Sequence, residues 1–287
     1  MKAMTAFKFL CIYEKKASRI FLSLFLMLSS AFLNATTINV TNYVTGDGVT
    51  DDSAGLQQAF DAAATQNATL QIPANCIIRT TKNLFIHGTC NIQGSGDSSI
   101  ILCDDDLAKD HGYYWICVGL TGHRNDGGIW DTFSGTISNL CIKASSNAKF
   151  GRAFFIFNTS ATTISDIFFD FRDGVSSPET QWYLFSATAS GNNANWELWG
   201  SGPPKTIENI TITRNTIIAN HCYTDYEGFG MELANNVVIS NNFIYGVGDD
   251  PIGCHFINGL EIKNNYCYSI DGRILANNCT DVLIEDN

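Results

Sequence analysis

The sequence predicts an all-β protein, a parallel β-helix that begins with a short capping helix. Three observations lead to this fold: a six-residue pattern that recurs four times near the C-terminus, alternation of apolar and polar residues within each copy, and an amphipathic segment ahead of the repeats. With 287 residues and 45% hydrophobic content, the chain is long enough to bury a sizeable core.

The repeated pattern is apolar-x-Ile-x-x-Asn. It occurs as ITITRN, VVISNN, LEIKNN and VLIEDN, which start at Ile210, Val237, Leu260 and Val282. These starts are 27, 23 and 22 residues apart, which is too short for a helical-hairpin repeat and fits one coil of three short strands with turns. The alternating apolar residues supply the inward face of each strand.

Each copy of the pattern ends in an asparagine. The four are Asn215, Asn242, Asn265 and Asn287. An amide side chain both donates and accepts hydrogen bonds, so stacked copies can bind the turn backbone and one another along the axis. The sequence therefore predicts an asparagine ladder.

Weaker copies of the pattern place further coils upstream. ISNLCIKA surrounds Leu140 and ISDIFFDF surrounds Ile167. Residues 173–204 interrupt the repeat, so we expect an inserted loop there. Its tryptophans are Trp182, Trp196 and Trp199. Trp196 is our candidate from this loop for stacking on a sugar ring, and packing of the insert is the alternative.

An amphipathic segment, residues 46–66, precedes the repeats and predicts a helical cap. Its apolar residues on one face at helical spacing are Leu56, Phe60 and Ala63. Asp51 or Asp52 can accept hydrogen bonds from the free N–H groups at the helix start, which gives this Asp pair a structural role. An open solenoid end exposes core and strand edges, which such a helix covers.

The first 35 residues have the features of a secretory signal peptide. Five basic residues precede the apolar run IFLSLFLML, and small residues follow it, so cleavage is expected near Ala31 or Ala35. The run is shorter than the ~20 residues that span a bilayer, which favours a cleaved signal over a membrane anchor. We therefore expect residues 36–287 to form one β-helix domain, secreted to an extracellular or periplasmic location and not membrane-bound.

Charge and cysteine usage limit the partners. Loss of the signal segment leaves 12 basic and 27 acidic residues, a net charge of −15, against −11 for the whole chain. Such an acidic protein repels nucleic acids, and an anionic substrate would need a metal ion or local basic residues. The nine remaining cysteines contain no CxxC pair, which argues against a zinc site and leaves at least one thiol without a disulfide. Oligomeric state is not predicted.

A long N-terminal segment resembles the start of the pectate-lyase-like superfamily, of the rhamnogalacturonase and epimerase type. It is GDGVTDDSAGLQQAFDAAATQNATLQIPANCIIRTTKNLFIHGTCNIQGSG, and the asparagine repeats continue the resemblance to the end of the chain. The resemblance implies a single-stranded right-handed parallel β-helix and a polysaccharide partner. Lyases, glycosidases, epimerases and phage tailspikes share this fold, so the resemblance is weak for function.

A second Asp-Asp pair, Asp249 and Asp250 in GVGDDPIG, recurs in part at the same place in neighbouring repeats. Residues eight and six positions before each repeat are apolar and should face the core, so odd positions should face outward. Coils stack ~4.8 Å apart, so polar residues of three coils should meet on one outer patch. The patch contains Glu227, Glu232, Asp249, Asp250, His255, Asp271 and Arg273.

One chemistry for this patch is glycoside hydrolysis, which needs no cofactor. The Asp-Asp coil resembles that of polygalacturonase-type glycosidases, which implies a pectin-like or other acidic glycan. Carboxylates one or two coils apart would be separated by roughly 5 to 10 Å, which includes the ~6.5 to 9.5 Å of inverting hydrolysis. The catalytic candidates are Asp249, Asp250, Asp271 and Glu227.

The chain departs from that family in three places. TDYEGFG replaces Asn-Thr-Asp-Gly, which leaves Asp225 or Glu227 as the substitute acid. Ile270-Asp271-Gly272 replaces Gly-His-Gly, and the Arg-x-Lys motif is absent.

The rival chemistry is calcium-assisted β-elimination, as in the pectate-lyase relatives. Ca²⁺ held by the same carboxylates would acidify the proton beside a uronate carboxylate, and Arg273 could remove that proton or position the sugar. Arginine is a poor base, so this role requires a strongly perturbed environment. The substrate-binding candidates are Arg273, His255, Glu232 and Trp196. For His255, an ordinary strand-surface position is an equal alternative.

A third class is not enzymatic. Adhesins and tailspike-like proteins use the same solenoid as a sugar-binding or structural rod, and Asp residues suit solvated turns, so the acidic cluster can be incidental. The last repeat ends at Asn287 with no segment left to cover it. We therefore expect either a fragment of a longer protein or a second chain that closes this end.

Overall fold

The computed structural model of the protein describes residues 36–107, 114–122, 129–150, 152–173, 185–188, 207–219, 228–269 and 272–287, with the backbone alone for 185–188. The chain divides into two units, Met1–Thr36 and Thr37–Asn287. The predicted signal segment, residues 1–35, lies outside the described residues. So do Trp182, Trp196, Trp199, Asp225, Glu227, Ile270 and Asp271, which were named above.

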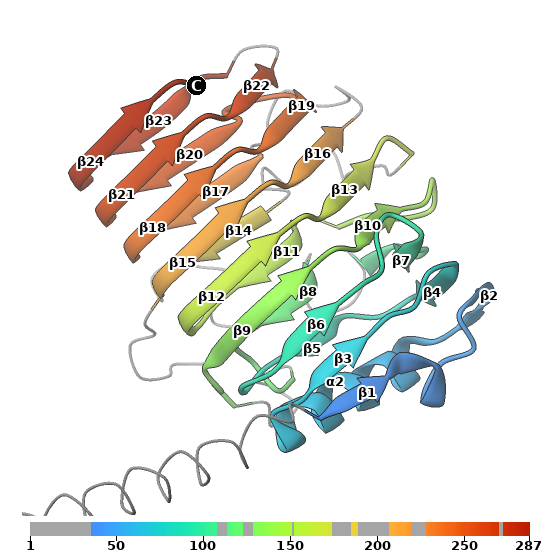
Figure 1. Ribbon diagram of the computed structural model, residues 1–287. Helices are drawn as coiled ribbons and strands as arrows, with labels where there is room; N and C mark the ends of the chain where they lie inside the picture. Colours follow the sequence, from blue (N-terminus) through green and yellow to red (C-terminus); the bar gives the residue numbers. More distant parts are fainter. Residues whose placement is uncertain are drawn as a thin grey trace, which may run out of the picture. The chain divides into compact units, whose positions relative to one another are not determined.

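The described residues of the second unit form three sheets of nine, eight and seven strands, and the strands of each sheet follow one another along a common axis (Figure 1). Every pair of neighbouring strands within these sheets is parallel, from β1 with β3 to β21 with β24. Consecutive strands of the chain visit the three sheets in turn, so that three strands make one coil. This is the parallel β-helix that the sequence predicted.

The strands have the following bounds. The nine-stranded sheet contains β1 (Thr37–Asn39), β3 (Thr69–Gln71), β6 (Asn91–Gln93), β9 (Phe133–Ser138), β12 (Thr159–Ser165), β15 (Glu208–Thr213), β18 (Asn235–Ser240), β21 (Asn258–Lys263) and β24 (Thr280–Glu285). The eight-stranded sheet contains β2 (Asp47–Asp51), β4 (Cys76–Thr80), β7 (Ser99–Cys103), β10 (Cys141–Ala144), β13 (Phe168–Phe171), β16 (Thr216–Ala219), β19 (Phe243–Val247) and β22 (Tyr266–Ser269). The seven-stranded sheet contains β5 (Leu84–Ile86), β8 (Tyr114–Val118), β11 (Arg152–Ile156), β14 (Phe185–Thr188), β17 (Phe229–Glu232), β20 (Ile252–His255) and β23 (Ile274–Asn277).

Helix α2 (Ser53–Gln66) caps the first coil, where it takes the place of a strand of the seven-stranded sheet. It contacts β3, β4 and β5, one strand of each sheet, and lies at the opposite end of the stack from β24 (Figure 1). The predicted apolar face is confirmed, because Leu56, Phe60 and Ala63 are buried. Within the described part of the chain, no helix is long and apolar enough to cross a membrane.

The two residues of the first Asp-Asp pair, Asp51 and Asp52, have different partners at the start of this helix. Asp51 Oδ1 accepts a hydrogen bond from the Ser53 N–H at 3.1 Å, as expected of a residue at a helix start. Asp52 instead accepts the N–H groups of Thr45 and Gly46 at 2.8 and 2.9 Å. One carboxylate therefore caps the helix, and the other ties down the loop that precedes it.

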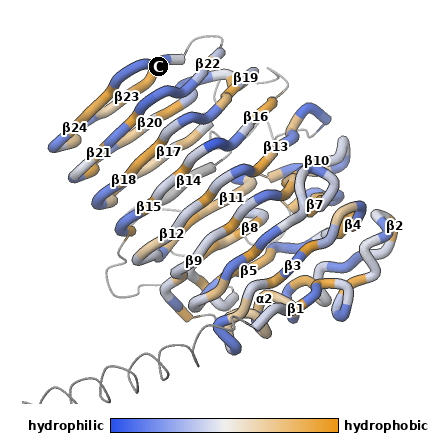
Figure 2. The backbone as a smooth tube through the Cα atoms, viewed as in Figure 1, coloured by the Kyte–Doolittle hydropathy of each residue, from blue (hydrophilic) through white to orange (hydrophobic). Residues whose placement is uncertain are grey.

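The core is built from columns of inward side chains in register. Val237 of β18 pairs with Ile210 of β15 and with Leu260 of β21, and all three are at most 1% exposed. Figure 2 shows hydrophobic and hydrophilic residues succeeding one another along the strands. Val282 continues this column in β24, where it is 42% exposed. The four repeats read from the sequence are thus four successive strands of one sheet.

The predicted asparagine ladder is confirmed at the bend between the nine- and eight-stranded sheets. Nδ2 of Asn215, Asn242 and Asn265 donates to Oδ1 of the next asparagine at 3.1, 3.0 and 2.8 Å, and the last acceptor is Asn287. The same Oδ1 atoms accept the backbone N–H of the preceding asparagine at 2.9, 3.0 and 3.0 Å. Asn215, Asn242 and Asn265 are 1, 2 and 4% exposed, so the hydrogen bonds among these three are shielded from water.

Two features differ from the sequence-based expectations or refine them. Strand β14 lies inside the predicted inserted loop, residues 173–204, and pairs with β11 and β17, so these four residues belong to the solenoid. The repeat pattern did not reveal the coil that contains β14, because long segments on both sides of β14 lengthen the spacing between repeats in the sequence. The eight cysteines in the described part of the chain form no disulfide, and six are buried, as expected of core residues.

Candidate functional site

The turn between β19 and β20 holds the second Asp-Asp pair. Asp250 is only 5% exposed, and its Oδ1 accepts the backbone N–H of Arg273 from the next coil at 2.9 Å. The Arg273 Nε lies 3.6 Å from the same oxygen. Oδ2 of Asp250 makes no hydrogen bond with any residue that the structure describes. The carboxyl group is therefore fixed through Oδ1, and its Oδ2 makes no further hydrogen bond within the described residues.

The predicted outer patch is wrong for Asp250. This residue stands two positions before Ile252 and four before Cys254, both fully buried. Because alternate residues of a strand face the same side, Asp250 lies on the inward side with them. Asp249 is half-buried, while the side chain of Arg273 is 74% exposed. The three residues come together as predicted, but the acid at their centre lies under the surface.

Two glycines allow the neighbouring coils to approach this turn. A Cβ on Gly272 would lie 2.0 Å from the carbonyl oxygen of Asp249, and one on Gly228 would lie 2.5 Å from that of Pro251. No larger residue fits at either place without backbone movement. The Asp249 turn is consequently held between the coils before and after it.

Glu232 and His255 are stacked as predicted, but they lie away from the turn. They are paired in register at the ends of β17 and β20, and Asn277 of β23 continues the column, with its Nδ2 3.5 Å from His255 Nδ1. At ~3.3 Å per residue, His255 lies about 16 Å along the strand from Asp250. The candidate residues therefore form two groups, one at each end of β20.

The described residues at the turn do not fit Ca²⁺. This ion takes about six to eight oxygen ligands, whereas Asp249 and Asp250 supply two carboxylates and Arg273 already lies beside one of them. No group of three acidic, histidine or cysteine side chains suited to a metal occurs among the described residues. The remaining acids of the predicted patch, Glu227 and Asp271, lie outside them.

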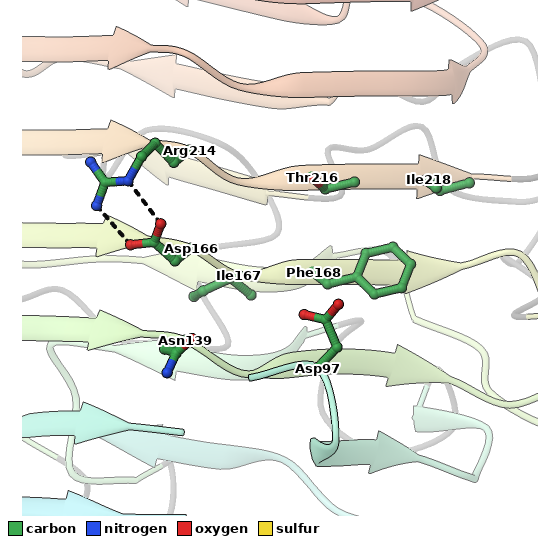
Figure 3. Close-up of a pocket in the computed structure, with 8 residues that line it drawn as sticks. All are labelled: Asp97, Asn139, Asp166, Ile167, Phe168, Arg214, Thr216 and Ile218. Atoms are coloured by element: carbon green, nitrogen blue, oxygen red, sulfur yellow. Dashed lines mark hydrogen bonds and ion pairs between the residues drawn. The ribbon is translucent and has the colours of Figure 1, made fainter. Parts of the chain in front are cut away.

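A groove that the sequence did not reveal lies at the bend between the nine- and eight-stranded sheets. It has a volume of about 400 Å³. Its lining residues are Asp97, Asn139, Asp166, Ile167, Phe168, Arg214, Thr216 and Ile218 (Figure 3). Figure 3 shows the Asp97 carboxylate directed from the loop after β6 towards Phe168. The groove therefore combines an aromatic ring with polar planar side chains.

One ion pair forms a wall of this groove. Arg214 Nε and Nη2 donate to Asp166 Oδ1 and Oδ2 at 2.8 and 2.7 Å (Figure 3). These hydrogen bonds hold the pKa of Asp166 below its usual value. Alignment of TTISDI with ITITRN would have placed Asp166 beside Arg214, because both stand one residue before the ladder position. That signal was available, but the weaker repeat obscured it.

No family model and no curated protein matches the sequence. Among solved structures, a presumed glycosyl hydrolase from Parabacteroides merdae is 10% identical, with a TM-score of 0.43 over 87% of this chain and 96% of that one. PfbA, a surface adhesin of Streptococcus pneumoniae, is 16% identical, with a TM-score of 0.43 over 83% and 63%. The A-module of the Azotobacter vinelandii mannuronan C-5 epimerase AlgE4 is 15% identical, with a TM-score of 0.29 over 86% and 80%. Similarity at this level carries no information on the activity of this chain.

Proposed function

We propose that this protein is an exported carbohydrate-active enzyme that hydrolyses a polysaccharide at the turn of Asp249 and Asp250. The observation that carries the proposal is the Asp250 carboxyl group, whose side chain is 7% exposed, fixed at Oδ1 by the Arg273 N–H and without a described partner at Oδ2. A carboxyl group held in one orientation can give or take a proton at a bound substrate. Half-buried Asp249 supplies the second carboxyl group that hydrolysis requires.

An acidic glycan, such as a pectin-like polymer, is the first substrate class to test. The resemblance of the Asp-Asp coil to polygalacturonase-type glycosidases supports it. The exposed guanidinium of Arg273 supports it too, because it places a positive charge where a uronate carboxylate would lie beside the turn. Local positive charge is needed, since the exported chain, with 12 basic and 27 acidic residues, carries a net charge of −15.

The test is a cleavage assay on the purified exported chain with polygalacturonate and with neutral polysaccharides. Replacement of Asp250 by Asn keeps the size of the side chain and removes its proton chemistry, so we expect a loss of at least about 100-fold in rate. Asp281→Asn is the matched control, because Asp281 is exposed and lies on another coil. Full activity in both Asp249→Asn and Asp250→Asn would contradict the proposed site.

The same assay separates hydrolysis from the two alternatives. New reducing ends alone indicate hydrolysis. New reducing ends with an unsaturated product that requires calcium indicate elimination, for which Glu227 and Asp271 would complete a cation site. Binding without new ends indicates a sugar-binding or structural protein.

Export is the part of the proposal that rests on the N-terminal segment. Its basic residues, apolar run and small residues near Ala31 and Ala35 support a cleaved signal. Mass spectrometry of the protein recovered outside the cytoplasm should find a new N-terminus close to these residues. An intact Met1 on cytoplasmic protein would contradict export.

A further inference from the structure

Four exposed aromatic rings stand on the outer face of the eight-stranded sheet. They are Phe243, Tyr245, Tyr266 and Tyr268, with exposed fractions of 39, 38, 58 and 49%. Phe243 stacks on Tyr266, and Tyr245 on Tyr268, each with ring centroids 4.9 Å apart. We call these four rings the aromatic quartet. Side chains of this size are normally buried, so their presence on one face indicates a contact surface.

The aromatic quartet and the groove form one continuous surface. Phe168 of β13 is in register with Thr216 of β16, which is in register with Phe243 of β19. Ile218, beside Thr216 in the groove, is likewise in register with Tyr245. Four strands at ~4.8 Å spacing place Phe168 and Tyr266 about 14 Å apart along the axis. A linear ligand that lies parallel to the axis would contact both.

The side chains of the groove have the chemistry of a sugar site. Asp97, Asn139 and Thr216 offer carboxylate, amide and hydroxyl groups that hydrogen-bond to hydroxyls, and Phe168 lies among them (Figure 3). Binding pockets typically combine aromatic and apolar walls with a few polar groups that fix the ligand. Thr216 stands in register between the rings of Phe168 and Phe243, and its side chain is smaller than either ring.

Charge on this surface favours an uncharged ligand. Arg214 is paired with Asp166, and Arg172 binds Asp170 through two hydrogen bonds of 2.7 and 3.0 Å. Lys143 Nζ lies 3.4 Å from the same Asp170 carboxylate. Each described cation of the surface thus has an acidic partner, while Asp97 adds a negative charge that repels a uronate.

The area of the aromatic quartet argues against a second copy of the chain as its occupant. An aromatic residue presents roughly 150 to 250 Å² when fully exposed, so four rings that are about half exposed present roughly 400 Å². A stable dimer buries about 800 Å² on each partner. The aromatic quartet alone is too small for such an interface, but it matches a ligand that is a few sugar rings long.

We propose that the outer face of the eight-stranded sheet, from the groove at Asp97 and Phe168 to Tyr266 and Tyr268, binds an uncharged glycan chain that lies parallel to the solenoid axis. The groove holds the hydroxyl groups of one sugar, and the aromatic quartet contacts the apolar C–H groups of the sugars that follow. This site uses none of the residues of the Asp249 turn, so it stands independently of the cleavage proposed there.

Affinity electrophoresis of the full exported chain tests the proposal. The gels contain a neutral β-1,4-glucan, a neutral xylan, a neutral mannan or polygalacturonate. At least one neutral polymer should retard the protein, and polygalacturonate should retard it less. Tyr266→Ala should weaken binding roughly two- to tenfold, and Tyr245→Ala with Tyr266→Ala about 100-fold at most. Tyr266→Phe keeps the ring and should bind like the unmodified chain.

Phe256→Ala is the matched control, because Phe256 is 54% exposed but follows β20, away from the quartet. It should leave retardation unchanged, and thermal unfolding of every variant checks that the solenoid is intact. Retardation by no neutral polymer, or an equal loss with Phe256→Ala, would overturn the proposal. A dimer in light scattering that Tyr266→Ala dissociates would assign the face to a second copy instead. Asp250→Asn should abolish cleavage and leave retardation intact, which separates this site from the proposed catalytic turn.

Discussion

The bend between the nine- and eight-stranded sheets is built in two ways along the same solenoid. In the C-terminal coils its inward position is Asn215, Asn242 or Asn265, joined to one another by hydrogen bonds. In two upstream coils the same position is Leu140 or Ile167, which are 0 and 1% exposed. The same bend of the backbone thus accommodates either hydrogen-bonded asparagines or packed apolar side chains.

The apolar and the asparagine versions of the bend are neighbours at Ile167 and Asn215. The backbone N–H of Ile167 donates to Asn215 Oδ1, and Asn215 Nδ2 donates to the carbonyl oxygen of Ile164, both at 3.0 Å. The first amide of the ladder therefore also satisfies the last apolar coil. An amide at this place is tied to its neighbours by specific atoms, whereas an apolar side chain needs only to fill space.

The largest effect is expected when one member of the ladder is removed. Asn242→Ala removes the partner of the Ile212 carbonyl oxygen and of the Asn215 N–H in a buried place, and Asn265 Oδ1 loses one of its two donors. Unsatisfied buried groups cost about 1 to 3 kcal/mol each, so we expect a loss of roughly 3 kcal/mol in the free energy of unfolding. Urea unfolding followed by circular dichroism measures it.

Asn242→Leu is the control, because it places an apolar residue at this position, as Leu140 and Ile167 do in the upstream coils. Leucine fills the space of the side chain but makes none of its hydrogen bonds, so this variant should lose about as much stability as Asn242→Ala. Stability close to that of the unmodified chain for either variant would show that the ladder is replaceable and that the two halves of the bend are equivalent.

The contrast between the two halves explains how much of the fold could be predicted. The amide ladder demands Asn at one place in each coil, so Asn215 and Asn242 made the repeat visible. Leu140 and Ile167 are ordinary apolar residues in an ordinary alternation, and the coils upstream of them carry no comparable marker. Strand β14 was missed because long flanking segments remove the regular spacing on which a repeat depends.

For the candidate turn, the sequence predicted which residues lie near one another but not the burial of Asp250. Asp249, Asp250 and Arg273 do meet, because register carries one coil onto the next. The burial of Asp250 follows from its parity, but its partner is the backbone N–H of Arg273, which no side-chain pattern reveals. The groove was missed because Asp97 and Phe168 come from different coils, neither of which belongs to the clear repeats.

The upstream half also buries a charged side chain, that of Asp170 in β13, three residues after Ile167. Asp170 is 3% exposed, and Asp170→Asn weakens its hydrogen bonds with Arg172, each worth about 1.5 to 3 kcal/mol when charged. Burial alone would raise the pKa of Asp170, but the hydrogen bonds from Arg172 and the charge of Lys143 leave it below the usual 3.8. We expect a loss of roughly 2 kcal/mol at neutral pH.

The pH dependence of this variant follows from the lowered pKa. A group whose pKa is depressed on folding stabilises the protein above its unfolded pKa of 3.8, and this contribution is lost as pH falls through the lower folded value. The difference in unfolding free energy between the unmodified chain and Asp170→Asn should therefore be full at pH 7 and shrink below 3.8. A difference that stays constant from pH 7 to pH 3 would contradict the charged role of Asp170.

A smaller effect is expected where the bend is apolar. Leu140→Met keeps the volume and the apolar character of a fully buried side chain, and such exchanges usually cost less than about 1.5 kcal/mol. We expect a loss of about 1 kcal/mol, well below that of Asn242→Leu. Urea unfolding of both variants in parallel gives the comparison, and equal losses would show that the apolar coil is as specific as the ladder.

The smallest effect is expected one residue before the ladder, where Arg214 adopts a left-handed conformation with φ of 56°. Asn139, Asn241 and Asn264 adopt it at the same place in other coils, and Asn tolerates this conformation better than Arg does. Arg214→Asn loses the ion pair with Asp166, but both side chains are largely exposed, at 57 and 40%, and such a pair contributes about 0 to 1 kcal/mol.

The gain in backbone preference should offset most of that loss, so Arg214→Asn is expected to change the free energy of unfolding by less than about 0.5 kcal/mol. Arg214→Val removes the same ion pair but places a β-branched residue in the left-handed region, which is sterically unfavourable and should cost about 1 to 2 kcal/mol more. Both variants lose the charge of Arg214, and they differ only in how well the new residue tolerates the left-handed backbone conformation. Comparing them therefore separates the effect of charge from that of conformation. Equal destabilisation by Asn and Val would show that the ion pair, and not the backbone angle, determines what this turn accepts.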